Sequence, residues 1–366
     1  MSRCATVLQE SHMRPLFAAR AGYSRRLLLA VSLTLGALVC TASRTTQGQS
    51  ITPAESNQAE AAKPGQEKKD DAAQAAAKSS AHHFDRVVII VLENGDYEVA
   101  VQDKNLAALA AKGASFSNFH ALFHPSYPNY LAMVAGTDFG IHRRGRYLAD
   151  RQVNFPNDAA HKTIADRLMA SGLDFKNYAE ELPQGTCPFR IDSQHVSKRK
   201  AGDYVRRHVP FMSFGEVQEK WCDRVVGVDS GKANSLLGED NFVKDAKAGL
   251  VAYSFYSPNM NDDGHNTNVG VAGAWVSKFL DKTFAEKLRK GTLVIVTFDE
   301  SDRNADNRIY TLFLGDMVKD ATQQDPKVLG RHYTHYNVLR TIEDNFGLQP
   351  LAEGDRDASP ITDIWK

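Results

Sequence analysis

Short runs of apolar, β-branched residues alternate along this chain with segments of helical periodicity. Strands are predicted at residues 86–92, 114–119, 174–178, 250–256, 293–298 and 309–314. Helices are predicted at residues 105–111, 163–170, 271–280 and 335–346, three of them followed closely by Gly113, Gly172 or Gly347. Strands that alternate with helices are typical of a parallel sheet with crossover helices. The pattern therefore predicts an α/β fold with a mostly parallel central sheet.

Residues 1–42 have the pattern of an export signal. The residues Arg14, Arg20, Arg25 and Arg26 precede an uncharged run at residues 27–39, and small residues follow to Ala42. This run is shorter than the roughly 20 apolar residues that a membrane-spanning helix needs. We therefore expect the segment to be cleaved and to leave no stable transmembrane span. The pair Arg25-Arg26 leaves both the Sec and the twin-arginine routes open. The mature protein is expected to be periplasmic or secreted, and the bulky Val39 disfavours a lipid anchor at Cys40.

The alternation of strands and helices is also missing from residues 43–83 and weak at residues 183–241. Residues 43–83 contain almost no large apolar side chain and are expected to form a disordered tether. Residues 84–366 are expected to form one catalytic domain. The pattern fades at residues 183–241, which are expected to form an insertion or a cap over the site.

Cys187 and Cys222 lie in the region at 183–241. In an oxidising compartment they are candidates for a disulfide, although two unpaired thiols remain the alternative because spacing alone does not show proximity.

Charge narrows the range of partners. Lys and Arg together number 44, as do Asp and Glu, so the formal net charge is zero. A nucleic-acid-binding protein would normally carry a basic face, and no nucleic-acid partner is expected. The basic clusters at residues 198–200 and 206–208 are interpreted as solvated loop charges.

Acidic and amide side chains directly follow two of the strongest predicted strands. Glu93 and Asn94 come after strand 86–92, and Asp299 and Glu300 come after strand 293–298. Ligands in open α/β sheets bind beyond the carboxyl ends of the strands, so both pairs should reach the same edge. Three carboxylates and an amide suit a divalent cation such as Mg²⁺, Ca²⁺ or Mn²⁺, or Zn²⁺ if a histidine joins them.

A serine lies between two prolines in His124-Pro125-Ser126-Tyr127-Pro128. Pro128 fits the first turn of a helix, which places Ser126 at or just before a helix N-terminus, where anions bind. Taken alone, Ser126 is more simply interpreted as a helix cap. Two histidines add candidate chemistry: His265, after Asp263 and a turn at Gly264, and His335, at the start of the last helix.

Together these motifs resemble the bacterial phosphoesterase family that includes secreted acid phosphatases and phospholipases C. That family belongs to the alkaline-phosphatase-like superfamily. The resemblance rests on the order of five motifs: Glu93-Asn94; His124-Pro125-Ser126 with Asn129; Ser257-Pro258-Asn259 with Asp263 and His265; Phe298-Asp299-Glu300; and His335-Tyr336. It implies a three-layer α/β/α fold. The first motif departs from the family pattern, because Gly95 stands where a basic residue or His is usual.

The resemblance also implies roles for individual residues. Ser126 would be the nucleophile that forms a phosphoserine, with His265 and His335 as further catalytic residues. The divalent metal ion would be held by Glu93, Asn94, Asp299 and Glu300. Asp263, His124 and Asn129 are candidates for support of the site.

The implied function is an acid phosphatase acting on small-molecule or lipid phosphate monoesters, phosphoinositides included. A phospholipase C that cleaves phosphodiesters is the alternative, which the close of the chain soon after the last helix disfavours. A non-catalytic phosphate-binding envelope protein is a second alternative, which would have no need of a nucleophile at Ser126.

Overall fold

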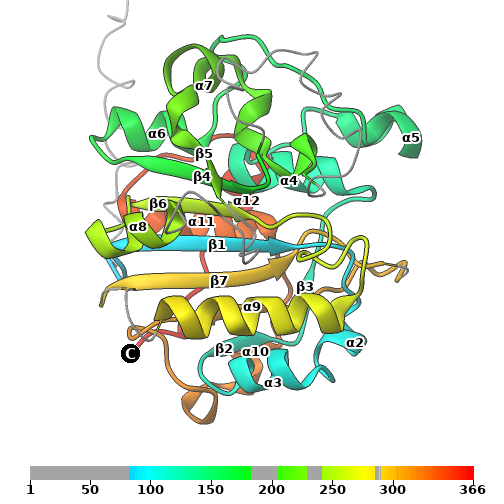
Figure 1. Cartoon of the computed structure of the whole chain (residues 1–366), viewed down its shortest axis with the longest axis vertical. Coiled ribbons are helices and arrows are strands. Elements are labelled where there is room, and N and C mark those ends of the chain that lie inside the picture. The colour runs from blue at the N-terminus through cyan, green and yellow to red at the C-terminus, as the bar shows by residue number, and fades with distance from the viewer. Residues whose placement is uncertain (1–81, 183–203, 229–240, 285–287, 289, 303) are drawn as a thin grey trace, which may run out of the picture. The chain divides into compact units, whose positions relative to one another are not determined.

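A seven-stranded sheet forms the centre of the fold (Figure 1). The computed structural model describes residues 82–182, 204–228, 241–284, 288, 290–302 and 304–366, all within one compact unit. The strand order is β2-β8-β7-β1-β6-β4-β5. The strands are β1 (Arg86–Leu92), β2 (Ala114–Phe116), β4 (Phe175–Glu180), β5 (Val225–Val228), β6 (Tyr253–Ser257), β7 (Thr292–Phe298) and β8 (Thr311–Leu314). Only β8 runs against its neighbours in this sheet.

Helices cover both faces of the sheet (Figure 1). One layer contains α2 (Tyr97–Ala100), α3 (Lys104–Ala110), α8 (Asn241–Ala248) and α9 (Val269–Phe284). The other contains α4 (Ser126–Ala135), α6 (Ile164–Ala170), α11 (His335–Phe346) and α12 (Glu353–Asp357). The predicted α/β fold and its three layers are therefore confirmed.

Shorter elements complete the described part of the chain. A two-stranded sheet pairs β3 (Phe119–His120) with β9 (Tyr333–Thr334). The remaining short helices are η1 (Ile141–Arg144), α5 (Arg146–Ala149), η3 (Arg206–His208), η4 (Pro210–Ser213), α7 (Gly215–Lys220), η5 (Cys222–Arg224), η6 (Ala321–Gln323) and α10 (Pro326–Leu329). Within the described residues, no helix combines the length and the apolar character needed to cross a membrane.

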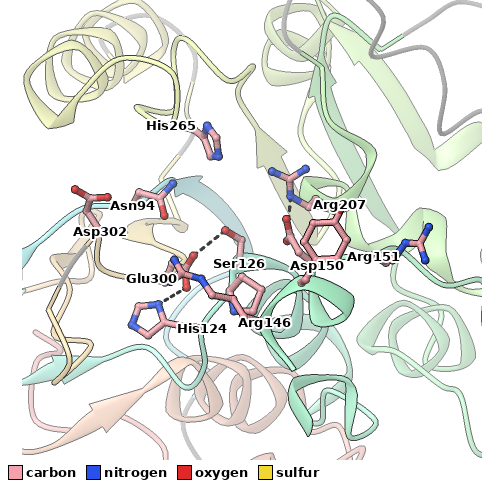
Figure 2. Close-up of a pocket in the computed structure, with 12 residues that line it drawn as sticks. Asn94, His124, Ser126, Arg146, Asp150, Arg151, Arg207, His265, Glu300 and Asp302 are labelled. Carbon is pink, nitrogen blue, oxygen red and sulfur yellow. Dashed lines mark hydrogen bonds and ion pairs between the residues drawn. The ribbon is translucent and has the colours of Figure 1, made fainter. Parts of the chain in front are cut away.

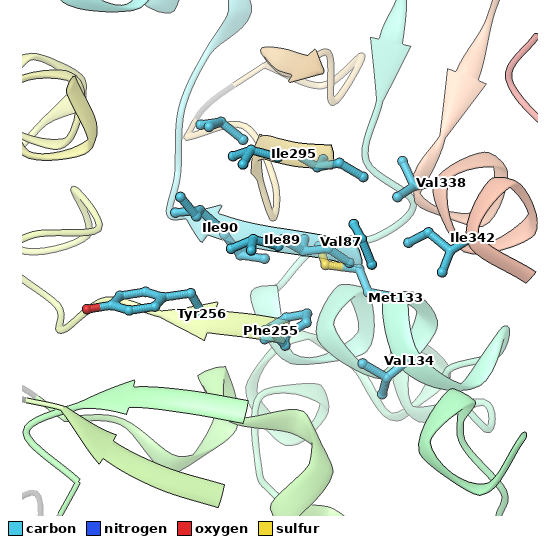
Figure 3. Close-up of a cluster of buried hydrophobic side chains, with 14 of the residues drawn as sticks. Val87, Ile89, Ile90, Met133, Val134, Phe255, Tyr256, Ile295, Val338 and Ile342 are labelled. Atoms are coloured by element: carbon cyan, nitrogen blue, oxygen red, sulfur yellow. The ribbon is translucent and has the colours of Figure 1, made fainter. Parts of the chain in front are cut away.

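The core lies where β1 and β7 pass between the two helical layers. All seven residues of β7 are buried, as are Val87 to Leu92 of β1, which explains why both segments are continuous apolar runs. Figure 3 shows side chains of β1, β6 and β7 packed with Met133 of α4 and Ile342 of α11. Burial of each such side chain contributes about 1.5–3 kcal/mol, so this cluster fixes the central strands in register.

The structure corrects several sequence expectations. The predicted strand at 114–119 is two strands, β2 and β3, in different sheets, and the strand at 309–314 begins at Thr311 and is antiparallel. The region at 183–241 is not only an insertion, because it supplies β5, which pairs with β4 at the sheet edge. Arg206 and His208 are buried, so their interpretation as solvated loop charges was wrong.

Other expectations fall on residues that the structure does not describe. The signal at 1–42 and nearly all of the tether at 43–83 lie outside the described residues. Cys222 is disulfide-bonded, but Cys187 lies outside the described residues, so their pairing stays a prediction.

Helix α11 carries a buried acid, Glu343, against α12. Burial and the neighbouring charge of Asp355 raise the pKa of Glu343 to about 10. Asp355 is itself fixed, since its carboxylate accepts the backbone N–H groups of Leu351 at 2.6 Å and Ala352 at 2.9 Å. Glu343 is therefore a neutral carboxylic acid in the folded protein near pH 7.

We predict that Glu343→Gln becomes more stable relative to the wild type as the pH rises. The folded pKa lies above the unfolded value, so the wild-type contribution is complete below pH 4.5 and is lost progressively toward pH 10. The amide does not titrate, and its advantage should grow by about 4 kcal/mol between pH 5 and pH 8 in urea unfolding. The exposed Glu98→Gln is the control. An advantage for Glu343→Gln that is the same at both pH values would contradict the prediction.

Candidate active site

Three neighbouring strands, β7, β1 and β6, bring the predicted site residues to one edge of the sheet. Backbone hydrogen bonds join the segments that follow these strands. The N–H of Asp299 donates to Leu92 O at 2.9 Å, that of Glu93 to Asp263 O at 2.8 Å, and that of Gly95 to Glu300 O at 3.0 Å. The two acidic pairs that the sequence placed on adjacent strands thus meet.

The Asn94-Gly95 turn has two conformational requirements. Asn94 adopts a φ of 54°, in the left-handed region that asparagine tolerates better than most residues. Its N–H donates to Asp299 Oδ1 at 3.2 Å, and its Nδ2 donates to Glu93 Oε2 at 3.4 Å. A Cβ on Gly95 would lie 2.2 Å from the Phe298 ring. The departure from the family pattern at Gly95 therefore has a packing reason.

Ser126 is the first residue of α4 and lies between two carboxylates. Its Oγ is 3.1 Å from Glu93 Oε2 and 3.0 Å from Glu300 Oε1, and it donates its hydrogen to this pair. Pro125, not Ser126, occupies the N-cap position, and the N-cap has no side-chain hydrogen bond. The helix-cap interpretation of Ser126 was wrong, because its hydroxyl donates to Glu93 and Glu300 and not to the backbone of the helix.

Asn129 fixes the loop that leads into α4. Its Oδ1 accepts the backbone N–H groups of Leu122 and Phe123, both at 3.0 Å, and its Nδ2 donates to Phe123 O at 2.8 Å. The asparagine is fully buried. It therefore positions the segment before Ser126 and takes no part in the surface that a ligand would contact.

Two residues that were not predicted from the sequence, Tyr130 and His208, contact the buried carboxylate of Glu93. Tyr130 donates its hydroxyl to Glu93 Oε1 at 2.8 Å. His208 Nε2 lies 3.0 Å from the same oxygen, its Nδ1 lies 3.3 Å from Asp263 Oδ2, and its ring stacks on Tyr130. Tyr130 was detectable, because a spacing of four residues puts it on the Ser126 face of the helix. His208 was not, since it comes from the region where the pattern fades.

The electrostatics follow from burying several acids together. Burial raises the pKa of Asp299 well above its usual range, and the charges of Glu93 and Glu300 raise it further. Burial also opposes ionisation of Glu93, but the charge and contact of His208 hold the pKa of Glu93 below its usual range. Burial alone would lower the pKa of His208, yet Glu93 and Asp263 raise it. His208 therefore lies between two acids, Glu93 and Asp263, that favour its protonated form.

The three histidines that were predicted to belong to the site, His124, His265 and His335, have different surroundings. His124 Nδ1 lies 2.5 Å from Glu300 Oε2, and this hydrogen bond raises the pKa of His124. His265 lines the cleft, with its backbone N–H bound to Asp263 Oδ1 at 2.8 Å. His335 is 1% exposed, and its Nε2 donates to Asp299 O at 2.8 Å. His335 is therefore buried against the Asp299 backbone and absent from the cleft lining, and its catalytic role stays a prediction.

A cleft of about 740 Å³ opens above these residues (Figure 2). Asn94, His124, Ser126, His265 and Glu300 line it, together with Arg146, Asp150, Arg151, Arg207 and Asp302. Glu93, Asp263 and Asp299 lie beneath its floor and are at most 1% exposed. The cleft therefore presents a serine hydroxyl, two histidines and an amide to a ligand, above a buried acidic layer.

The donor chemistry of this floor fits a divalent cation. Asp299 Oδ2 is buried and has no hydrogen-bond partner among the described residues. An orphaned carboxylate oxygen beside Glu93 and Glu300 is costly unless positive charge balances it. Within the described ranges, no three His, Cys, Asp or Glu side chains form a complete ligand set by themselves. Asn94 and Ser126 would therefore need to contribute oxygens.

The chain is similar to proteins of one family. A model of the Phosphoesterase family matches residues 100–349. A Kluyveromyces lactis protein described as a "probable acid phosphatase" is 35% identical over 286 residues, covering 76% of this chain and 62% of that protein. A Mycobacterium tuberculosis phosphatidylinositol-3-phosphatase is 31% identical over 292 residues, covering 79% of this chain and 85% of that protein.

The fold has a solved counterpart. A protein of the alkaline phosphatase superfamily from Vibrio parahaemolyticus superimposes with a TM-score of 0.52 at 15% identity, covering 77% of this chain and 70% of that one. This similarity confirms the predicted fold class. The chain spans about three fifths of the length of the fungal acid phosphatases that it matches.

We predict that His208→Ala strongly destabilises the protein. Removing the imidazole ring leaves Glu93 and Asp263 buried without their shared partner, and breaking a buried ion pair typically costs about 3–5 kcal/mol. The measurement is the free energy of unfolding in urea. His82→Ala is the matched control, because the exposed His82–Asp85 pair at 3.1 Å should contribute little. Equal stability of the two variants would show that His208 does not balance the buried acids.

Proposed function

The chain belongs to the Phosphoesterase family, and on that premise we propose that it is a metal-dependent phosphomonoesterase with Ser126 as its nucleophile. The observation that carries the proposal is the Ser126 hydroxyl, held between Glu93 and Glu300 in the lining of the cleft. A serine that only caps a helix would bond to backbone N–H groups instead. The acid phosphatase and phosphatidylinositol-3-phosphatase names of the relatives favour a phosphate monoester as substrate.

The proposed reaction has two displacement steps at phosphorus. In the first, the Ser126 oxygen forms a bond to phosphorus, its proton passes to Glu300, and the ester P–O bond breaks. His265 donates a proton to the departing oxygen. In the second, His265 takes a proton from water, the water oxygen bonds to phosphorus, and the bond to Ser126 breaks. Glu300 then returns the proton to Ser126, so each group ends as it began.

The surrounding residues tune this chemistry. Burial raises the pKa of Glu300 and the hydrogen bond from His124 limits the shift. A cation bound to Glu300 would act in the opposite direction and lower this pKa. The backbone N–H groups at the start of α4 stabilise negative charge on the phosphoryl oxygens. A divalent cation held by Glu93, Asn94, Asp299 and Glu300 would supply Lewis-acid polarisation of the phosphoryl group. Asp263 supports the site through His208 and the His265 backbone.

The cellular setting is part of the proposal. The pattern of residues 1–42 supports export to the periplasm or the medium, with residues 84–366 as the catalytic domain. The small-molecule or lipid phosphate esters found there would be the substrates.

We predict that Ser126→Ala lowers kcat for a chromogenic phosphomonoester by about 10³-fold or more, because the covalent path is lost. Ser117→Ala, which removes a hydroxyl bonded to Leu329 O outside the cleft, is the matched control and should retain full activity. Full turnover by Ser126→Ala would exclude the proposed nucleophile.

Phosphatidylcholine is assayed beside the monoester. Turnover of that lipid alone would favour the phospholipase C alternative. If neither substrate is hydrolysed in the presence of Mg²⁺, Ca²⁺, Mn²⁺ or Zn²⁺, the result would favour a non-catalytic phosphate-binding protein.

We predict that a divalent cation stabilises the protein and that Asp299→Asn abolishes this effect. Binding to the native state alone adds about 2.7 kcal/mol at a hundredfold excess over Kd. The measurement is the thermal unfolding midpoint of the chelator-treated protein titrated with Mg²⁺, Ca²⁺, Mn²⁺ or Zn²⁺. The control is Asp316→Asn, whose Oδ1 accepts the Gly291 N–H at 3.0 Å at the far end of the sheet. The same upward shift for Asp299→Asn and wild type would place the cation elsewhere.

A further inference from the structure

The cleft lining contains three arginines, called the arginine wall, that the proposed reaction does not use. Arg146, Arg151 and Arg207 all line the cleft (Figure 2). They come from α5, the residue after its C-cap Asp150, and η3. Three acidic residues, Asp150, Glu300 and Asp302, line the same cleft, so what matters is which of the arginines lacks an acidic partner.

Two of these arginines have no acidic partner within the part of the chain that the structure describes. Arg207 Nε lies 3.2 Å from Asp150 Oδ1, and this pair accounts for the Arg207 charge. Arg146 and Arg151 have no ion pair and no side-chain hydrogen bond among the described residues, and both are exposed. Arg146 is close enough to the site for its charge to oppose protonation of His124. Two guanidinium groups are therefore available to an anion in the cleft.

The wall is anchored on both sides of Arg151. Asp150 is held by Arg207. Gln152 Oε1 accepts a hydrogen bond from Nη1 of the buried Arg206 at 3.3 Å, and Arg206 Nη2 binds Met212 O at 2.6 Å. Val153 donates its N–H to the Tyr127 hydroxyl at 3.2 Å, one residue after Ser126. The backbone that carries Arg151 is thus tied to the helix that carries the nucleophile.

The size of the cleft exceeds what one phosphoryl group needs. Its volume of about 740 Å³ falls in the roughly 300–1,000 Å³ range of sites that take whole small molecules. The phosphoryl group would lie over Ser126, which leaves the arginine wall beside the rest of the substrate. Guanidinium groups bind phosphate and carboxylate with paired hydrogen bonds, and unpaired ones do so without first breaking an ion pair.

We propose that Arg146 and Arg151, at separate points of the cleft, bind anionic groups of the substrate other than the phosphoryl group that reacts, so that the preferred substrates are phosphomonoesters that carry another phosphate or a carboxylate. This proposal rests on the phosphomonoesterase function and names the substrate class of the same cleft. The chemistry is shared by soluble bisphosphates and by phosphoinositide headgroups, in which a phosphodiester accompanies the monoester.

The test compares kcat/KM for three substrates: glucose 6-phosphate, fructose 1,6-bisphosphate and a soluble short-chain phosphatidylinositol 3-phosphate. We expect the wild type to favour at least one doubly anionic substrate over glucose 6-phosphate by about tenfold or more. Arg146→Gln and Arg151→Gln should each reduce that ratio about fivefold, and Arg146→Lys should retain part of it. Arg143→Gln is the matched control, since Arg143 is an exposed arginine of η1 that does not line the cleft.

The outcomes separate this proposal from the proposed function. An unchanged ratio in both glutamine variants overturns the role of the arginines while leaving the phosphatase intact. Preference for the lipid alone identifies a headgroup as the source of the second anion, and preference for the sugar bisphosphate identifies a soluble one.

A binding arm decides the case in which no substrate is hydrolysed. Calorimetry with fructose 1,6-bisphosphate on the Ser126→Ala protein should then show a Kd about tenfold weaker after Arg146→Gln. Equal affinities overturn the proposal.

Discussion

The constraint on which this structure depends is the burial of acidic groups beside one serine hydroxyl. Glu93, Asp299 and Glu300 are each at most 6% exposed, and like charges at such depth repel strongly. Each acid has its own compensation: His208 and Tyr130 for Glu93, the Asn94 N–H for Asp299, and His124 for Glu300. What remains uncompensated is one oxygen of Asp299, which is the position that favours a cation.

The fold meets this constraint by topology. Strands β7, β1 and β6 are neighbours, so residues distant in sequence reach one edge, and backbone hydrogen bonds between their following segments fix the register there. Helix α4 then lies with its first residue over that edge, and its next turn returns to the same carboxylate through Tyr130. Helix η3, from the region where the sequence pattern fades, contributes His208 and Arg207 to the site. Arg146 and Arg151 come from α5 and the residue after its C-cap.

Much of this arrangement was predictable because parallel strands have simple rules. The buried runs of β1 and β7 identify the centre of the sheet, and residues that follow such strands must converge, which located Glu93, Asn94, Asp299 and Glu300. His208 could not be found this way, because it lies in the short helix η3 and not after a predicted strand. Its basic neighbours Arg206 and Arg207 also have the pattern of a solvent-exposed loop. The role of His335 was also beyond the sequence: whether a histidine at a helix start faces a cleft or a backbone carbonyl depends on packing that no local pattern encodes.

The central claim is that the Ser126 oxygen becomes bonded to phosphorus during turnover. The most direct measurement is acid quenching of the enzyme during steady-state hydrolysis of a monoester, followed by peptide mass spectrometry of the segment that contains Ser126. The account predicts the added mass of one phosphoryl group on Ser126 in the wild type. Rapid turnover with an unmodified Ser126 at every quench time, or a phosphoryl group trapped on another residue, would contradict it.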